Sequence, residues 1–177
     1  EFGPEYRTER IDTNITRTVV SGGTPEGLAL RAECTEYADF PVTEWVMYIT
    51  NESSANSALI SDWRLFAEFP ACEKCEAVLL HGNGDNCAPA GYSWQEDELS
   101  ANALEISPCG DGTSCNGAFP YMRLKLPGGG VNLAVGWTGT WKLKAEKSGG
   151  CARIEASQQR FNTYLEPGET VRTPSLI

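Results

Sequence analysis

Glycine and proline interrupt this sequence so often that long helices are excluded, and this feature restricts the chain to short extended segments. The 177 residues include 18 glycines and 10 prolines, spread through most of the chain. Proline removes a backbone donor and glycine weakens regular elements, so the stretches between them stay short. Within those stretches apolar and polar residues alternate, as at Leu28, Leu30, Ala32 and Cys34. This is the period of a strand that is half-buried in a sheet.

Other segments have the same alternation or the β-branched and aromatic residues typical of strands. We expect strands over residues 45–49 (buried on both faces), 63–67, 76–81, 121–126, 131–135, 141–145, 152–156 and 161–165. Pro127–Gly130 and Glu166–Glu169 have the residues of tight turns, because glycine reaches positive φ at little steric cost. About ten to twelve strands at this spacing predict an all-β fold: an antiparallel, supersandwich-like β-sandwich of two packed sheets.

The length is that of one domain, so we expect a single β-sandwich domain over residues 1–177. Residues 1–4, Glu-Phe-Gly-Pro, resemble a remnant of cloning. Residues 72–115 are polar and rich in glycine and cysteine, which predicts a long loop excursion from the sheets. Such loops on a rigid β scaffold commonly carry binding function.

The charge balance limits the partners of this chain. It has 24 Asp and Glu residues against 14 Lys and Arg residues, for a net charge of −10. An acidic surface repels phosphate groups, so we expect neither nucleic acid nor membrane as a partner. The charge suits a neutral ligand. Two sequons, at Asn14 and Asn51, have the sequence of glycosylation acceptors.

Seven cysteines in an acidic, glycine-rich β chain favour an oxidising compartment, so we expect an extracellular or secreted protein. The local bridge that we favour joins Cys109 to Cys115 and closes the short loop between them. Cys72 is expected to pair with Cys75 or with Cys87.

The Cys72-x-x-Cys75 spacing is also that of half a zinc site. A structural zinc would need a second pair, and the wide Cys109–Cys115 spacing does not provide one, so we expect no metal and no other cofactor. Cys34 and Cys151 lie in expected strands and are either buried thiols or a further bridge. The odd total leaves at least one thiol free or paired outside the chain.

The sequence has no recognisable catalytic arrangement. Its only histidine, His81, has no nucleophile elbow near it, and either hydrogen-bonds locally or serves a sugar site. The dense acidic run is Glu96-Asp97-Glu98, but adjacent residues of a strand point to opposite faces, so we do not expect a glycosidase carboxylate pair there. We predict no catalytic residues.

The aromatic residues are the strongest functional indication, because the apolar C–H face of a sugar stacks on flat rings. Trp45, Trp137 and Trp141 lie in strand patterns, and we interpret them as core residues. Tyr92 and Trp94 are two apart in polar surroundings, so in an extended chain they share a face. Trp94 either contacts a ligand or a second, barrel-shaped domain, or it caps the edge of the sandwich.

Several segments together carry a resemblance to one family. They keep their order along the chain: 28–37, 39–46, 114–120, 134–141 and 165–174. Over roughly residues 25 to 177 the chain resembles the N-terminal domain of α-galactosidases of glycoside hydrolase family 36. The resemblance implies an extended β-sandwich packed against a (β/α)₈ barrel whose two aspartates carry out retaining hydrolysis. Such a barrel needs about 200 residues or more, so we expect no activity from this chain alone.

The resemblance also implies that loops of this domain shape the rim of a carbohydrate site. By that implication the candidate carbohydrate-binding residues are His81, Asn83, Asp85, Trp94 and Asn116. We therefore expect a non-catalytic accessory domain of a secreted α-galactosidase-like glycoside hydrolase, with a catalytic barrel of the same polypeptide and a galactoside-like glycan as partners. The added cysteines depart from the family pattern. They keep two alternatives open, a stand-alone carbohydrate-binding module or lectin-like domain and a purely structural β-sandwich.

Overall fold

The computed structural model describes residues 3–85, 87–109 and 112–177, and these residues form strands and no helix. The ten strand pairs whose registers are defined are antiparallel. The prediction of an antiparallel all-β fold is therefore confirmed. No helix in the described ranges is a candidate to cross a membrane. The first two residues of the expected cloning remnant lie outside the described residues, as do Gly110 and Asp111 of the loop between Cys109 and Cys115.

The chain divides into two compact units. The first unit consists of Glu1–Leu65, Arg160–Ser175 and Ile177, and the second of Phe66–Gln159 and Leu176. The expectation of one domain over residues 1–177 stays a prediction. The described residues form sixteen strands rather than ten to twelve, because five of the strands have only two or three residues.

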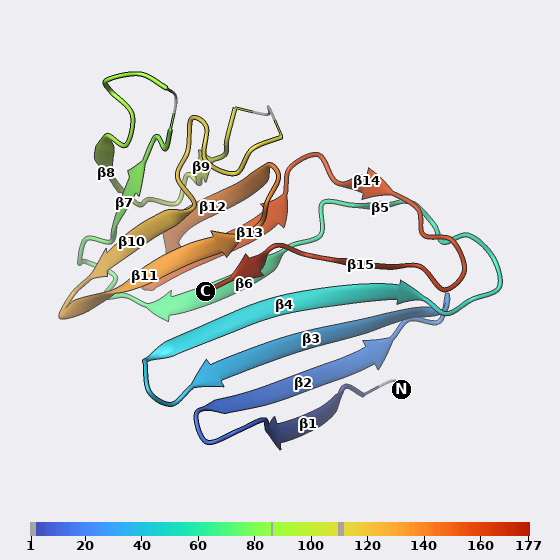
Figure 1. The fold of residues 1–177 in the computed structure, drawn as a ribbon. Coiled ribbons are helices and arrows are strands. Elements are labelled where there is room, and N and C mark those ends of the chain that lie inside the picture. The colour runs from blue at the N-terminus through green and yellow to red at the C-terminus, as the bar shows by residue number, and fades with distance from the viewer. Residues whose placement is uncertain (1–2, 86, 110–111) are drawn as a thin grey trace. The chain divides into compact units, whose positions relative to one another are not determined.

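Long strands of the first unit follow one another as an antiparallel meander (Figure 1). They are β1 (Glu5–Arg10), β2 (Ile15–Gly23), β3 (Leu28–Tyr37) and β4 (Val42–Asn51), with the short β15 (Thr170–Arg172) paired to β4. A separate pair joins β5 (Ile60–Ser61) to β14 (Asn162–Thr163). Asp12 turns the chain between β1 and β2, since its Oδ1 accepts hydrogen bonds from the backbone N–H groups of Asn14 (2.7 Å) and Ile15 (2.8 Å).

The core of the first unit lies at one end of the meander. Ile49, Trp63 and Leu165 are buried together, and the ring of Trp63 lies 5.8 Å from that of Phe161. The interpretation of Trp45 as a core residue is wrong, because its side chain is 42 % exposed. Trp45 and Ile49 share a face of β4, but Trp45 lies about 13 Å along the strand from the cluster that covers Ile49. The expectation that residues 45–49 are buried on both faces is also wrong, because Trp45 is exposed and only Ile49 of this stretch is buried.

The second unit contains four neighbouring strands of the ten-stranded sheet and a separate four-stranded sheet; Figure 1 labels these strands. The four neighbouring strands have the order β11 (Gly129–Gly136), β10 (Tyr121–Leu126), β7 (Val78–Gly82), β8 (Trp94–Glu98). The four-stranded sheet has the order β6 (Leu65–Pro70), β13 (Cys151–Gln158), β12 (Trp141–Ser148), β9 (Leu104–Ile106). The last strand of the chain is β16 (Ser175–Leu176).

Burial alternates along the strands of the second unit, as it does in packed sheets. Leu143 on β12 and Ile154 on β13 are fully buried, and their polar neighbours in sequence are not. Trp141 is confirmed as a core residue: it is fully buried, and its indole N–H donates to the backbone oxygen of Ser114 (2.8 Å). The two predicted tight turns are also confirmed. Pro127 and Gly128 join β10 to β11, and the N–H of Glu169 donates to the backbone oxygen of Glu166 (3.0 Å).

Residues 72–115 are not one irregular loop, because they contain β7, β8 and β9. The sequence of β8, Trp-Gln-Glu-Asp-Glu, has no apolar alternation, yet it pairs with β7 over five residues. As the last strand of its sheet, β8 is largely exposed, so polar residues are compatible with it.

Candidate functional site

Four aromatic side chains of the second unit contact one another around Phe119, and we call Tyr92, Trp94, Phe119 and Tyr121 the aromatic cluster. The ring of Phe119 lies 5.5 Å from that of Tyr92, 5.9 Å from that of Trp94 and 5.2 Å from that of Tyr121. Two of these contacts are edge-to-face, a geometry that aromatic pairs favour. The three outer side chains are 50–57 % exposed. The cluster is therefore a surface of accessible rings around one half-buried ring.

Backbone hydrogen bonds hold the segments that carry these rings. The N–H of Phe119 donates to the oxygen of Gly82 (2.8 Å), and the N–H of Tyr92 donates to the oxygen of Gly84 (2.7 Å). In the pairing of β7 with β8, Gly82 lies opposite Trp94. The rings are thus positioned by the backbone before any ligand arrives, which lowers the entropic cost of binding.

Gly84 brings a second loop against this one. It has a φ of +65°, forms an isolated bridge with Asn116, and precedes Asp85, whose N–H donates to the oxygen of Cys115 (2.8 Å). A Cβ at position 84 would lie only 1.9 Å from the oxygen of Cys115. Both the positive φ and the close approach require glycine. Segments 83–85 and 114–116 consequently lie side by side.

Asn83 and Asp85 place polar groups in the loop that follows β7. The Nδ2 of Asn83 donates to the backbone oxygen of Ala90 (2.9 Å), whereas its Oδ1 is buried and has no hydrogen-bond partner among the described residues. Asp85 is exposed, and its Oδ1 accepts the backbone N–H of Cys87 (2.9 Å).

His81 differs from the other predicted site residues because its ring is buried. Only 5 % of the residue is exposed, and its Nε2 lies 2.8 Å from Oδ2 of Asp97, with Gln95 also in contact. This is the local hydrogen bonding that the sequence left open as one interpretation. The structure thus brings Asn83, Asp85 and Asn116 together on neighbouring loops and places Trp94 at the start of β8. It buries His81 on β7 against Asp97 and Gln95. The role of the predicted site residues in carbohydrate binding stays a prediction.

Phe119 and Tyr121, which complete the aromatic cluster, are not among the site residues predicted from the sequence. A usable signal was present, since Phe119 and Tyr121 are two residues apart, as Tyr92 and Trp94 are. What the sequence does not contain is the contact between the two pairs, which depends on the hydrogen bond between Phe119 and Gly82.

The cysteines, all of which lie in the described residues, are free thiols in this structure. The expected bridge between Cys109 and Cys115, and that between Cys72 and Cys75 or Cys87, are thus not formed in it. Cys34 is a buried thiol, and its pKa is raised, chiefly by burial and further by the charge of Glu36. Within the described ranges no three metal-ligating side chains come together.

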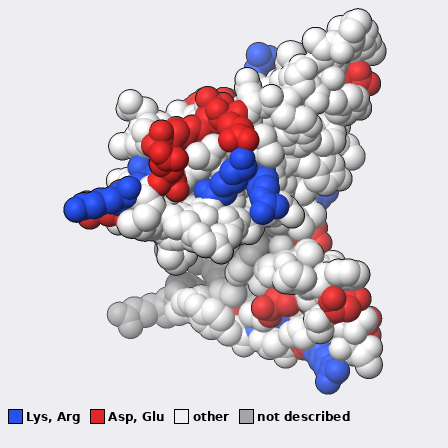
Figure 2. All heavy atoms as spheres, turned by 90° about the vertical axis from the view of Figure 1, so that its left-hand side faces the viewer, with Lys and Arg blue, Asp and Glu red and all other residues white. Residues whose placement is uncertain are grey.

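The acidic run of β8 has its own partners. Oε1 of Glu96 lies 2.6 Å from Nζ of Lys125, and Asp97 contacts His81 as described above. In the space-filling view, Asp and Glu side chains gather in one part of the surface with Lys and Arg side chains beside them (Figure 2). The pairing fits an exposed, solvated strand rather than a pair of carboxylates that flank a bond to be cleaved.

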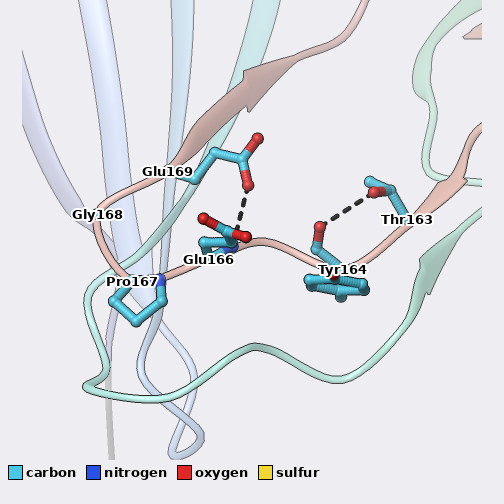
Figure 3. A pocket seen from close by; sticks show the side chains of 6 residues that line it. All are labelled: Thr163, Tyr164, Glu166, Pro167, Gly168 and Glu169. Carbon is cyan, nitrogen blue, oxygen red and sulfur yellow. Dashed lines mark hydrogen bonds between the residues drawn. The ribbon is translucent and has the colours of Figure 1, made fainter.

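An open depression in the first unit is lined by residues of a turn (Figure 3). The N–H of Glu166 donates to Oε2 of Glu169 (2.9 Å), and Oγ1 of Thr163 donates to the backbone oxygen of Tyr164 (3.0 Å). The polar groups therefore stabilise the turn itself. Nothing in this arrangement points to a ligand, and the aromatic cluster remains the better candidate site.

Comparison with solved structures decides what this fold is. The galactosidase domain of the α-galactosidase-sucrose kinase AgaSK matches 98 % of this chain with a TM-score of 0.77 and 14 % identity. The family 36 α-galactosidase AgaA from Geobacillus stearothermophilus matches 99 % (TM-score 0.76, 16 % identity) and the α-galactosidase from Lactobacillus brevis matches 98 % (0.75, 19 %). This chain has the fold of one domain of the family 36 α-galactosidases.

The resemblance found in the sequence is thus confirmed at the level of the fold. The chain spans only 26–27 % of the length of these three structures. No protein-family model matches the sequence, and a search of curated proteins finds no match.

Proposed function

We propose that this chain is the N-terminal, non-catalytic accessory domain of a secreted α-galactosidase-like glycoside hydrolase, and that it braces a catalytic barrel of the same polypeptide. One observation carries the proposal: the match covers 98–99 % of this chain but only about a quarter of each enzyme, 26–27 %. The described residues contain no helix, so they offer nothing from which a (β/α)₈ barrel is built. Secretion is supported by the seven cysteines.

The test is to read the coding sequence past Ile177 and to produce the encoded polypeptide with and without residues 1–177. We expect the longer polypeptide to hydrolyse an aryl α-galactoside and the 177-residue chain not to. Removing residues 1–177 should lower the temperature at which the enzyme loses activity, because the barrel loses a packed neighbour. A coding sequence without a barrel, or hydrolysis by the 177-residue chain, would refute the proposal.

The aromatic cluster favours a second role, contact with a neutral carbohydrate. Three exposed rings offer faces on which the C–H groups of a sugar stack. The exposed carboxylate of Asp85 lies in the adjacent loop, and carboxylate oxygens accept hydrogen bonds from hydroxyl groups. Few polar groups beside a mainly aromatic surface are the usual composition of a ligand site. Forms of AgaA have been solved with stachyose and with raffinose, so galactosyl oligosaccharides are the natural probes.

Calorimetric titration of the 177-residue chain with raffinose and stachyose tests this role. Trp94→Ala should weaken binding about tenfold, since the loss of one stacked ring is worth roughly 1.4 kcal/mol. Trp45→Ala is the matched control: this tryptophan is also exposed, at 42 %, but belongs to the first unit. Equal losses in both variants would exclude the aromatic cluster as the site.

The same titration separates the alternatives. Binding by a chain whose gene encodes no barrel indicates a stand-alone carbohydrate-binding module or lectin-like domain. If the unmodified chain gives no signal at millimolar sugar, the purely structural β-sandwich is favoured.

A further inference from the structure

The segment Cys72-Glu73-Lys74-Cys75 forms an exposed turn between β6 and β7. The backbone N–H of Cys75 donates to the oxygen of Cys72 (3.1 Å), as in a β-turn. The ends of such a turn have Cα atoms less than about 7 Å apart, which overlaps the range that a disulfide requires. Cys72 is exposed and Cys75 is half-buried. The two thiols are therefore placed to react with each other, and Cys72 is accessible to a partner in solution.

The turn is fixed to the hairpin between β12 and β13. The N–H of Ala71 donates to the oxygen of Gly150 (2.7 Å), and Nζ of Lys147 donates to the oxygen of Glu73 (2.9 Å). The second contact also brings a positive charge beside the thiols. Because backbone bonds already hold the turn, a covalent bond between its ends is not needed to form it.

The surroundings shift the pKa values of the two thiols in opposite directions. The hydrogen bond from the thiol of Cys75 is the largest cause of the lowered pKa of Cys72. The backbone N–H groups of Lys74 and Cys75 and the charge of Lys147 act in the same direction, against the effect of desolvation. The pKa of Cys75 is raised, first by that same hydrogen bond and then by desolvation. Cys72 is therefore the thiol that ionises first, and the thiolate is the nucleophile.

We propose that Cys72 and Cys75 form a redox-active dithiol that undergoes reversible exchange with low-molecular-weight disulfides. The thiolate of Cys72 attacks one sulfur of a disulfide RSSR, which forms a Cys72–SR mixed disulfide and releases RS⁻. Cys75 then loses its proton and attacks Sγ of Cys72, which forms the Cys72–Cys75 disulfide and releases the second RS⁻. Two electrons pass from the dithiol to RSSR, and the two thiol protons end on two RSH molecules.

The geometry favours thiol–disulfide exchange over a permanent structural disulfide. A disulfide stabilises a fold mainly by closing a loop in the unfolded chain, and the effect grows with loop length. The loop between Cys72 and Cys75 is one of the shortest that can be closed, so its bond contributes little to folding. An exposed bridge with a nearby cation is the type that thiols reduce readily. Within the described residues no third metal-ligating side chain joins the pair, so a metal site of three ligands is not formed here.

The test equilibrates the 177-residue chain in a series of ratios of reduced to oxidised glutathione and follows the peptide 72–75 by differential alkylation and mass spectrometry. We expect a reversible transition between a form with two alkylated thiols and one with none. Cys75→Ala should trap one glutathione on Cys72, whereas Cys72→Ala should trap little on Cys75. Cys87 is also exposed and serves as the comparison thiol. Under limiting iodoacetamide, Cys72 should react about tenfold faster than Cys87.

Lys147 provides the matched control. Lys147→Ala should slow alkylation of Cys72 and shift its pH profile to higher pH, and Lys147→Arg should restore both. A bridge that millimolar glutathione cannot reduce would be a structural disulfide and would overturn the proposal. Equal trapping on Cys72 and Cys75 would overturn it too. These measurements read thiols only, so their failure leaves the proposed role as an accessory domain unaffected.

Discussion

Replacing Gly84 by alanine should damage the candidate site in a way that can be separated from ordinary backbone strain. An L-residue at its φ of +65° costs about 1–2 kcal/mol. In addition, the new Cβ would lie 1.9 Å from the oxygen of Cys115, so the two loops must move apart. That movement breaks the hydrogen bond from Asp85 to Cys115 (2.8 Å), worth about 1 kcal/mol net. We expect a total loss of about 2–3 kcal/mol from the free energy of unfolding.

Gly128→Ala is the matched control, since Gly128 has a φ of +82° but a Cβ added there would meet no atom within 4 Å. It should cost only the backbone term of about 1–2 kcal/mol. Urea denaturation measures both free energies, with an unchanged slope as the check that the unfolding reaction is the same. Near-ultraviolet circular dichroism should change for Gly84→Ala and stay constant for Gly128→Ala, because only the first displaces the aromatic cluster. Equal losses in the two variants would refute the close approach of the loops.

Three further predictions concern the first unit. Asn51→Ala should lower the free energy of unfolding in urea by about 2–4 kcal/mol, because the fully buried amide donates to the oxygens of Ala55 (2.7 Å) and Leu165 (2.8 Å). In a glycosylating host the folded protein should carry a glycan on exposed Asn14 and none on buried Asn51, as a glycosidase-sensitive mass shift will show. The free energy of unfolding should fall as the pH rises above the ordinary thiol pKa, because the unfolded chain releases the proton of Cys34 at a lower pH than the folded chain does. Urea titrations over a series of pH values measure this fall, and Cys34→Ala should reduce it.

The sequence predicts those strands that are buried on one face, and misses those that are not. The alternation at Leu28, Leu30 and Ala32 identifies β3, since a half-buried strand must alternate. Strand β1 reads Glu-Tyr-Arg-Thr-Glu-Arg and is exposed over nearly its whole length, so no apolar period marks it. The pairing of β1 with β2 is formed by backbone hydrogen bonds, and the amino-acid sequence of β1 indicates it only weakly.

The site was predictable in its composition but not in its assembly. Polar surroundings indicated that Trp94 lies at the surface, and its side chain is 50 % exposed. Trp45 shows the limit of the same reasoning, because a strand pattern does not reveal which part of a face a neighbouring segment covers. The contacts of Phe119 and the burial of His81 depend on the pairing of distant segments, which a single sequence does not encode in a readable way.

The position of β8 at the end of its sheet has a consequence for the behaviour of the protein at high concentration. An outer strand with free backbone groups is a template on which another copy of the same chain can add, the first step toward aggregates. Glu96, Asp97 and Glu98 occupy this outer strand, so two copies that approach each other there bring like charges together. Acidification or concentrated salt weakens that repulsion, which makes neutral, dilute buffer the condition in which the protein stays dispersed.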